Sequence, residues 1–387
     1  MEPIRDEENF LVFGQPPIEQ PEIDEVVASL EDKWPGTGPK AKQFEEAFAD
    51  YVGAEHAVAV NSCTAALHLG LECLDLEPGD EVITTPMTFC ATVNTIIHAG
   101  GTPVLADVDP ETQNIDPAAV EAQITDDTRA ILPVHFAGRA CDMEALGALC
   151  DEYDLALVED CAHAVETEYD GRKVGTFGEF GCYSFYATKN VVTGEGGMVV
   201  TDDAEVAERL RVLSLHGMSR DAWKRYSSDG YSHYQVVEAG FKYNMMDLQA
   251  AMGIHQLARV EENWERRLEI WRAYQEAFAD LPVDRPAPFD DDHRHALHLY
   301  TLMIDEERAG LDRDTFLETL NDHNIGTGVH YLSIPEHPFY REKFDWSLEE
   351  TPVAVRLGRQ TVSLPLAPNL TDEDVADVIE AVGRTVG

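Results

Sequence analysis

The sequence predicts an α/β protein with a large, mostly parallel sheet and a smaller α+β domain at its carboxyl end. Short apolar segments alternate with helical patterns between residues 57 and 159, which is typical of parallel strands with crossover helices. This alternation stops near residue 160, and a long helical pattern follows at 245–281. The residues after 282 are enough for a second, small domain. We therefore expect two domains rather than one core.

The elements of the first half follow one another regularly. Strands are expected at residues 57–60, 81–85, 102–108, 130–135 and 155–159, and helices at 64–74, 88–98, from 116 onward and at 142–153. Pro86 closes the second strand, Gly100 ends the second helix, and Pro117 takes the first position of a helix, where a missing N–H group is harmless. This order predicts a sheet with helices on both faces.

The second half has a different rhythm. Strands are expected at 183–187 and 197–201, joined by a loop that holds Lys189 and the turn Gly194-Glu195-Gly196-Gly197. The helical pattern at 245–281 precedes a strand at 299–304, a helix at 313–323 and a final strand–helix pair. We therefore expect a large domain over residues 1–250, with an N-terminal arm of about residues 1–40. Residues 251–387 are expected to form a bridging helix and a small domain.

The charge of the chain is strongly one-sided. It carries 73 acidic and 28 basic residues, a formal net charge of −45. Such a chain repels nucleic acids and anionic membranes, so we expect neither as a partner. Its 44% hydrophobic content argues against disorder, and the acidic residues are spread along the sequence. We interpret them as a solvated surface suited to high salt, which predicts a halophilic source.

The cysteines and the N-terminus indicate a reducing compartment. The seven cysteines are odd in number and form no CxxC pair, which favours buried thiols over disulfides or a zinc site. The first ten residues, MEPIRDEENF, have neither the positive nor the apolar region of a signal peptide. No stretch approaches the ~18 apolar residues of a membrane helix. We expect a cytoplasmic protein.

Several common catalytic patterns do not occur in the sequence. It has no GxxxxGK[ST] loop, no strand-linked GxGxxG, no HExxH and no GxSxG. The run Asp290-Asp291-Asp292-His293-Arg294-His295 could suggest a metal site, but such a run is more typical of a solvated interdomain loop. We therefore expect no metal.

Three segments follow predicted strands, at the edge where α/β sheets bind ligands. Asn61-Ser62-Cys63-Thr64 is a strand-to-helix turn that could hold a phosphate on free N–H groups or could simply cap a helix. Asp160 could bind a metal, act as a base, pair with a protonated ring nitrogen or cap a helix. Lys189 is one of only eight lysines; it could become nucleophilic through burial, or could be a surface lysine.

Seven segments in order carry a resemblance to a known family. They are Gly36-Thr37-Gly38-Pro39 with Phe44-Glu45, Gly79 to Ile83 with Thr88-Phe89, Val158 to Ala164, Ser184 to Lys189, Thr193 to Gly197, Gly240 to Met245, and His330-Tyr331. In this order they resemble the DegT-type (DegT/DnrJ/StrS) sugar aminotransferases, which are fold-type-I pyridoxal-phosphate enzymes. The resemblance covers most of the chain. It implies that fold, pyridoxal 5′-phosphate as the cofactor and a transaminase activity.

The resemblance also implies roles for individual residues. Lys189 would bind the cofactor covalently and then move a proton between donor and cofactor. The cofactor-binding residues would be Cys63 and Thr64 with Ser184 around the phosphate, Phe89 on the ring, Asp160 at the ring nitrogen, His163 at the ring hydroxyl, and Asn244 from a neighbouring subunit. The substrate residues would be His330, Tyr331 and Arg225. For Phe89 the alternative is a core residue, and for Arg225 a surface arginine.

Two positions depart from the family pattern. Cys63 stands where the family usually has glycine, so a side chain crowds the backbone near the phosphate. His163 stands where glutamine is frequent; it can donate the same hydrogen bond, but its titration would make the cofactor sensitive to pH. The family also contains a dehydratase type in which histidine replaces the lysine, and the presence of Lys189 favours transamination.

These observations predict an aminotransferase that moves an amino group, from glutamate, to a nucleotide-linked keto-sugar. We expect a homodimer with shared active sites, because the resemblance places Asn244 at the partner's phosphate; the alternative is that Asn244 caps the helix that follows it. Two other functions remain open at this point. One is transamination of a free keto-cyclitol or another small ketone, and the other is a regulatory protein that keeps the fold without turnover.

Overall fold

A seven-stranded sheet forms the centre of the molecule. The structure is a computed structural model that describes residues 2–219, 234–289 and 292–387. The strands are β1 (His56–Val60), β2 (Glu81–Thr84), β3 (Thr102–Leu105), β4 (Thr128–Leu132), β5 (Ala156–Asp160), β8 (Phe180–Ser184) and β9 (Gly197–Thr201). Their order is β1-β9-β8-β5-β4-β2-β3, and β9 alone among them runs antiparallel to its neighbours. The predicted α/β class is confirmed.

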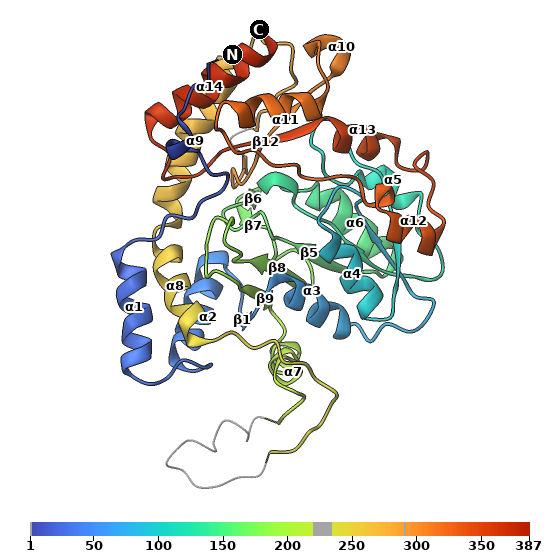
Figure 1. The fold of residues 1–387 in the computed structure, drawn as a ribbon. Helices are drawn as coiled ribbons and strands as arrows, with labels where there is room; N and C mark the ends of the chain where they lie inside the picture. The colour runs from blue at the N-terminus through green and yellow to red at the C-terminus, as the bar shows by residue number, and fades with distance from the viewer. Residues whose placement is uncertain (1, 220–233, 290–291) are drawn as a thin grey trace.

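Helices cover both faces of this sheet (Figure 1). One face packs against α2 (Pro39–Val52), α5 (Pro117–Glu121), α6 (Met143–Tyr153) and α8 (Asp247–Ala258), and the other against α3 (Cys63–Glu72), α4 (Cys90–His98) and α7 (Ala204–Ser214). Successive strand residues point to opposite faces, so Ala57 packs with α2 while Val58 packs with α3. Because both faces are covered, the strands are mostly apolar on both sides rather than alternating.

A second core lies beside the sheet, at the top of Figure 1. Its centre is an antiparallel pair, β11 (Tyr300–Met303) and β12 (Thr361–Leu364), packed against α9 (Val260–Ala277), α11 (Arg313–Asp322) and α14 (Asp372–Val386). The short helices of this half are α10 (Glu306–Ala309), α12 (Pro338–Phe344) and α13 (Pro352–Gln360). The expected strand, helix and final strand–helix pair are therefore all present in this half.

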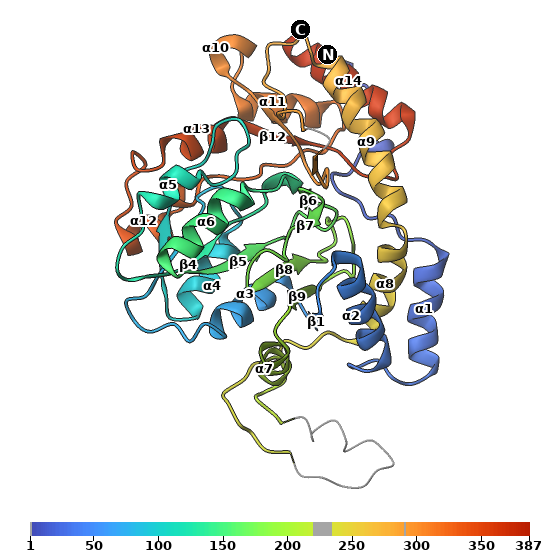
Figure 2. The ribbon, with the colours of Figure 1, turned by 180° about the vertical axis from the view of Figure 1, so that it is seen from behind.

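The N-terminal segment touches both cores. Helix α1 (Gln20–Glu31) packs against α8, while Leu11 lies in the second core and pairs with Ile325. The two chain ends lie side by side in both views (Figures 1 and 2). Arg5 also forms ion pairs with Asp374 and Asp377 near the start of α14.

The structure corrects two predicted elements. The pattern at 245–281 is not one helix, because Arg259 leaves the helical conformation between α8 and α9 and reaches the buried Glu22. The strand expected at 183–187 ends at Ser184 instead. The apolar pattern continues past that point because Phe185 is fully buried in the core against Phe44 of α2, not because the strand does.

The charged run near residue 292 is also different from the prediction. His293–Arg294 form a short strand, β10, that pairs with β6 (Glu168–Tyr169), and β6 pairs with β7 (Arg172–Lys173). His295 is buried. The expectation of a solvated loop is therefore wrong for these residues, while Asp290 and Asp291 lie outside the described residues. Among the helices that the structure describes, none is long and apolar enough to cross a membrane.

Candidate active site

A cavity of about 510 Å³ opens at the carboxyl edge of the sheet. The strands β1, β2, β5 and β8 all end there, so the polar residues that follow them meet in one place. The predicted site residues that line it are Cys63, Thr64, Phe89, Asp160, His163, Ser184, Lys189, His330 and Tyr331. We call it the lysine cavity. The structure thus brings together nine residues that are spread over most of the chain.

Lys189 lies in the loop after β8 and faces this cavity. Burial lowers the pKa of its amine to about 8, although nearby Cys63 and Asp160 act in the opposite direction. Roughly a tenth of the lysine is therefore neutral at pH 7, far more than for an ordinary lysine, and a neutral amine is nucleophilic. Lys189 is only partly exposed and lines the cavity, which favours the nucleophilic alternative over a surface lysine.

Asp160 is the last residue of β5 and is almost fully buried. One carboxylate oxygen accepts a hydrogen bond from the Ala162 N–H group at 3.1 Å, and the other accepts from the Thr92 hydroxyl at 2.9 Å. Burial raises the pKa of this carboxyl group, while the two donors and Lys189 favour its charged form. The carboxylate is therefore oriented and would gain from a cationic partner in the cavity.

The turn after β1 has the geometry of an anion site. Ser62 caps α3 by accepting a hydrogen bond from the Ala65 N–H group, so the capping interpretation is correct for this residue. Cys63 and Thr64 then occupy the first helical positions, where backbone N–H groups have no acceptor within the helix. Ser184, at the end of β8, lines the same part of the cavity. Amides and hydroxyls here can hold a phosphate without a cation.

Gly197 lets β9 approach this turn closely. A Cβ atom at this position would lie 2.5 Å from the Ser62 carbonyl carbon and oxygen and 2.7 Å from the Cys63 nitrogen. The side chain of Cys63 is directed toward β8, where its thiol donates to the Cys182 carbonyl oxygen at 3.6 Å. Burial raises the pKa of that thiol well above its usual value. Cys63 is therefore accommodated as a neutral thiol.

The opposite wall consists of rings. Phe89 is 58% exposed, which rules out a core role and leaves its ring free at the cavity. His163 contacts the Tyr331 hydroxyl through Nε2 at 3.1 Å, and its Nδ1 accepts from the Ala137 N–H group. Burial lowers the pKa of His163 well below its usual value. The ring therefore stays neutral near neutral pH, and the titration that we expected to affect the cofactor lies below that range.

One predicted residue that the structure describes does not line this cavity. Asn244 lies outside it, with its amide donating to the Thr37 hydroxyl and its oxygen accepting from Lys242. The residue that precedes α8 as its N-cap is Met246, so the interpretation of Asn244 as a helix cap is wrong. Arg225 lies outside the described residues.

Sequence reasoning did not identify His298. This buried residue lies just before β11, and its Nε2 atom is 3.5 Å from the Lys189 amine. Thr92, the hydroxyl donor to Asp160, was not identified either. Neither residue follows a strand of the large sheet, so the rule that found Asp160 and Lys189 does not apply to them.

Three buried groups beneath Asp160 have the composition of a metal site but are already partnered. His135, Glu159 and Cys161 bring their ligand atoms within 4.8 Å of one another. However, Glu159 accepts from His135 at 3.1 Å and from the N–H groups of 175, 177 and 178. The His135 Nδ1 atom accepts from the Cys141 N–H group. We interpret this cluster as support for the end of β5.

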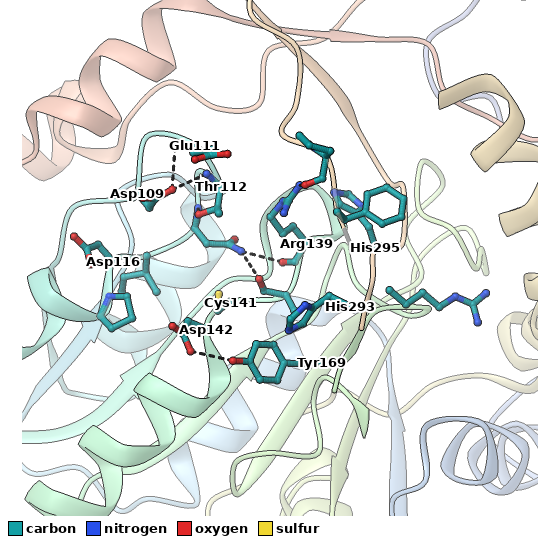
Figure 3. Close-up of a pocket in the computed structure, with 17 residues that line it drawn as sticks. Asp109, Glu111, Thr112, Asp116, Arg139, Cys141, Asp142, Tyr169, His293 and His295 are labelled. Atoms are coloured by element: carbon teal, nitrogen blue, oxygen red, sulfur yellow. Dashed lines mark hydrogen bonds between the residues drawn. The ribbon is translucent and has the colours of Figure 1, made fainter. Parts of the chain in front are cut away.

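A second cavity, of about 530 Å³, lies near β6 and β10 (Figure 3). We call it the outer cavity; it is lined among others by Asp109, Arg139, Asp142, Tyr169 and Arg294. Several of its charged groups are engaged with the protein itself. Arg139 donates to the carbonyl oxygens of 287 and 288, Asp142 accepts from Tyr169 and caps α6, and Arg294 pairs with Glu261. The larger volume therefore does not mark the reactive site.

The lysine cavity fits pyridoxal phosphate by the chemistry of its groups. This cofactor requires an amine for its aldehyde, a carboxylate for its ring nitrogen and donors for its phosphate. Lys189, Asp160 and the start of α3 supply these in one cavity. When bound, the cofactor supplies an electron sink. The fold and this cavity define a fold-type-I pyridoxal-phosphate enzyme.

Comparison with known proteins gives the family. Residues 16–383 match the model of the DegT/DnrJ/EryC1/StrS aminotransferase family. The spore coat polysaccharide biosynthesis protein SpsC of Bacillus subtilis is 51% identical over 98% of both chains. The chain belongs to this family, and it is a pyridoxal-phosphate-dependent aminotransferase.

Two solved structures are similar over nearly the whole length. The PLP form of Spr1654 from Streptococcus pneumoniae has a TM-score of 0.89 and 30% identity, covering 98% of this chain and 100% of that one. DesI, solved in the presence of its TDP-sugar product, has a TM-score of 0.86 and 33% identity, covering 98% of this chain and 93% of that one. Both agree with the fold-type-I assignment.

Proposed function

We propose that this aminotransferase moves an amino group from glutamate to a keto-sugar carried on a nucleotide, with Lys189 as the residue that binds the cofactor. The observation that carries the proposal is the position of Lys189, whose partly neutral amine faces Asp160 across one cavity. Lys189 would hold the cofactor and then move a proton between donor carbon and cofactor. Asp160 would keep the ring nitrogen protonated.

The other cavity residues have positioning roles in this proposal. Thr64 and Ser184 would bind the phosphate together with the backbone at Cys63, and Phe89 would stack on the ring. His163 would donate a hydrogen bond to the ring hydroxyl, for which the Ala137 N–H group leaves its proton on Nε2.

The substrate part of the proposal rests on the relatives and on the mouth of the cavity. DesI has a TDP-sugar product, and SpsC takes part in polysaccharide biosynthesis. His330 and Tyr331 lie at the wall of the cavity in the second half of the chain, where a sugar could meet both cores. The family resemblance supports glutamate as the amino donor in this proposal.

We further propose that the active enzyme is a homodimer with shared sites. Asn244 does not line the cavity of its own chain. Its side chain lies beside Thr37 and Lys242. A partner subunit related by a two-fold axis would present the same residue to the first cavity.

A substrate panel tests this function. The purified enzyme is mixed with glutamate and one candidate acceptor per reaction. The acceptors are nucleotide-linked keto-sugars, the matching free keto-sugars and a keto-cyclitol, and mass spectrometry detects the aminated product. We expect amination in the nucleotide-sugar series and not with the matching free keto-sugars or a keto-cyclitol. Amination of the free ketones alone would contradict the nucleotide part of the proposal and would support the small-ketone alternative.

A further inference from the structure

His298 contacts both the catalytic loop and the wall of the lysine cavity. Its Nε2 atom lies 3.5 Å from the Lys189 amine, and its Nδ1 atom lies 3.0 Å from the Asn190 side-chain oxygen. Its ring also packs on His163, with ring centres 4.4 Å apart. A single imidazole therefore contacts two consecutive residues of the loop that carries Lys189.

The hydrogen bonds around Asn190 determine which nitrogen of His298 carries the proton. The Asn190 amide nitrogen lies 2.8 Å from the Ala296 carbonyl oxygen, which can only accept. The same nitrogen donates to both oxygens of Glu166, at 2.9 and 3.0 Å. The other atom of the Asn190 amide is therefore its oxygen, and His298 must donate to it from Nδ1. Consequently Nε2 has a free lone pair that points at Lys189.

We infer that His298 is a positioning residue that accepts a hydrogen from the Lys189 amine and so keeps the lone pair of that amine directed into the cavity. An amine that donates to an acceptor keeps its own lone pair available, whereas a neighbouring N–H donor would occupy it. In cofactor capture the lysine nitrogen bonds to the aldehyde carbon, and the aldehyde oxygen leaves as water with both amine hydrogens. His298 orients the nitrogen for this step and takes part in no bond change.

The surroundings keep His298 in the neutral form that this role needs. Burial lowers the pKa of His298 well below its usual value, and His163 and Lys189 act in the same direction. The titratable groups that act electrostatically with Lys189 are Cys63, Asp160, His163, His298 and His330. Glu166 stays paired with the buried Arg267 at 3.4 Å. Asn190 and Glu166 thus fix the tautomer from outside the cavity.

Two variants of His298 separate the two ring nitrogens. In His298→Asn the amide can still donate to Asn190, but nothing replaces Nε2; in His298→Gln an amide oxygen can stand near the place of Nε2. The full-length apoprotein is mixed with pyridoxal phosphate over a pH series, and the rate of capture is followed by visible absorbance. We expect the limiting rate at high pH to fall about tenfold in His298→Asn and to stay within about twofold in His298→Gln.

The pH dependence of capture gives a second readout. The midpoint for the wild type is expected at the Lys189 pKa of about 8. It should move down in His298→Asn, because the ammonium form loses an acceptor that stabilises its charge. Equal limiting rates and equal midpoints for the Asn and Gln variants would overturn the inference, since packing alone would then explain the residue.

A third measurement reads the tautomer in the wild-type protein directly. Nitrogen-15 NMR of the wild-type apoprotein reports the His298 tautomer, with the resonance assigned from the His298→Gln spectrum. We expect the proton on Nδ1, and a proton on Nε2 would overturn the inference even if His298→Asn failed to fold. The inference rests on the role proposed for Lys189. Lys189→Ala is therefore measured in parallel, and covalent capture by that variant would refute the Lys189 role while leaving the tautomer result to be judged separately.

Discussion

The lysine cavity and the outer cavity are similar in volume but opposite in chemistry. In the lysine cavity, burial lowers the pKa of Lys189 to about 8 and raises that of Asp160. In the outer cavity, Asp142 caps a helix and Arg294 pairs with Glu261 at 2.6 Å. The lysine cavity thus holds an amine and a carboxylate whose ionisation burial alters, whereas Asp142 and Arg294 of the outer cavity are engaged with other groups of the protein. The combination of a buried amine and a buried carboxylate in one cavity, and not volume, therefore distinguishes the reactive site from the outer cavity.

The largest expected effect comes from Lys189→Ala. Turnover should fall by roughly 10⁴-fold or more, because no other amine faces Asp160 among the described residues of the cavity. The exposed Lys343→Ala is the matched control and should keep wild-type turnover. Rates and far-ultraviolet circular dichroism are measured for both. Substantial turnover in Lys189→Ala would contradict the assignment of the lysine cavity as the reactive site, since the reactive amine would then lie elsewhere.

The two cavities can be compared directly with one type of substitution. Asp160→Asn should lower kcat by about 10²–10³-fold, because a neutral amide cannot hold the ring nitrogen protonated. Asp142→Asn, in the outer cavity, should leave kcat within about twofold and change stability by less than about 1 kcal/mol, since asparagine also caps helices. Steady-state kinetics and urea unfolding give both values. A comparable loss of kcat in both variants would contradict the claim that the lysine cavity, and not the outer cavity, is the reactive site.

A smaller effect is expected from mixing two inactive variants. Lys189→Ala and Asn244→Ala are each shown to be nearly inactive and are then unfolded and refolded together. If Asn244 acts across the interface, a mixed dimer contains one fully native site, and random mixing restores roughly a quarter of the sites. If activity stays at background although mixed dimers have formed, Asn244 does not complete the partner's site.

The smallest effect concerns the acidic surface. With a formal net charge of −45, self-repulsion is strongest at low ionic strength, where the Debye length is about 30 Å at 0.01 M salt. We expect Tm to rise with salt, by about 2–4 °C for each kcal/mol of repulsion relieved. Calorimetry across a salt series checks this. A flat or falling Tm would contradict the halophilic interpretation without affecting the enzyme.

Sequence reasoning found the parts of the site that follow strand ends. Asp160 and Lys189 come directly after apolar runs, and the parallel sheet brings such positions to one edge. The same reasoning placed β8 three residues late, because the buried Phe185 continues the apolar pattern beyond the last ladder pair at Ser184. It also joined α8 and α9, since one non-helical residue, Arg259, hardly changes the periodicity.

The parts that sequence did not indicate depend on contacts between distant segments. His298 reaches Lys189 because the segment before β11 forms backbone hydrogen bonds with Ala137 and Gly138, and no local pattern marks that approach. Helices α1, α2 and α7 were not predicted. Their amphipathic patterns are ordinary, but they lie outside the alternation of strands and helices that guided the prediction. The division of the chain at residue 250 and the dimer remain predictions.

Through Gly197, strand β9 can affect a phosphate bound at the start of α3 without contacting that phosphate. Because a methyl group here would collide with the Ser62 carbonyl and the Cys63 nitrogen, any other residue must push the turn away from the strand. Such a shift would move the first amides of α3, which are the groups proposed to hold the phosphate. A side chain at position 197 would therefore reach the cofactor through the backbone of the turn, and a variant here should need more added vitamin than the wild type to reach the same occupancy of its sites.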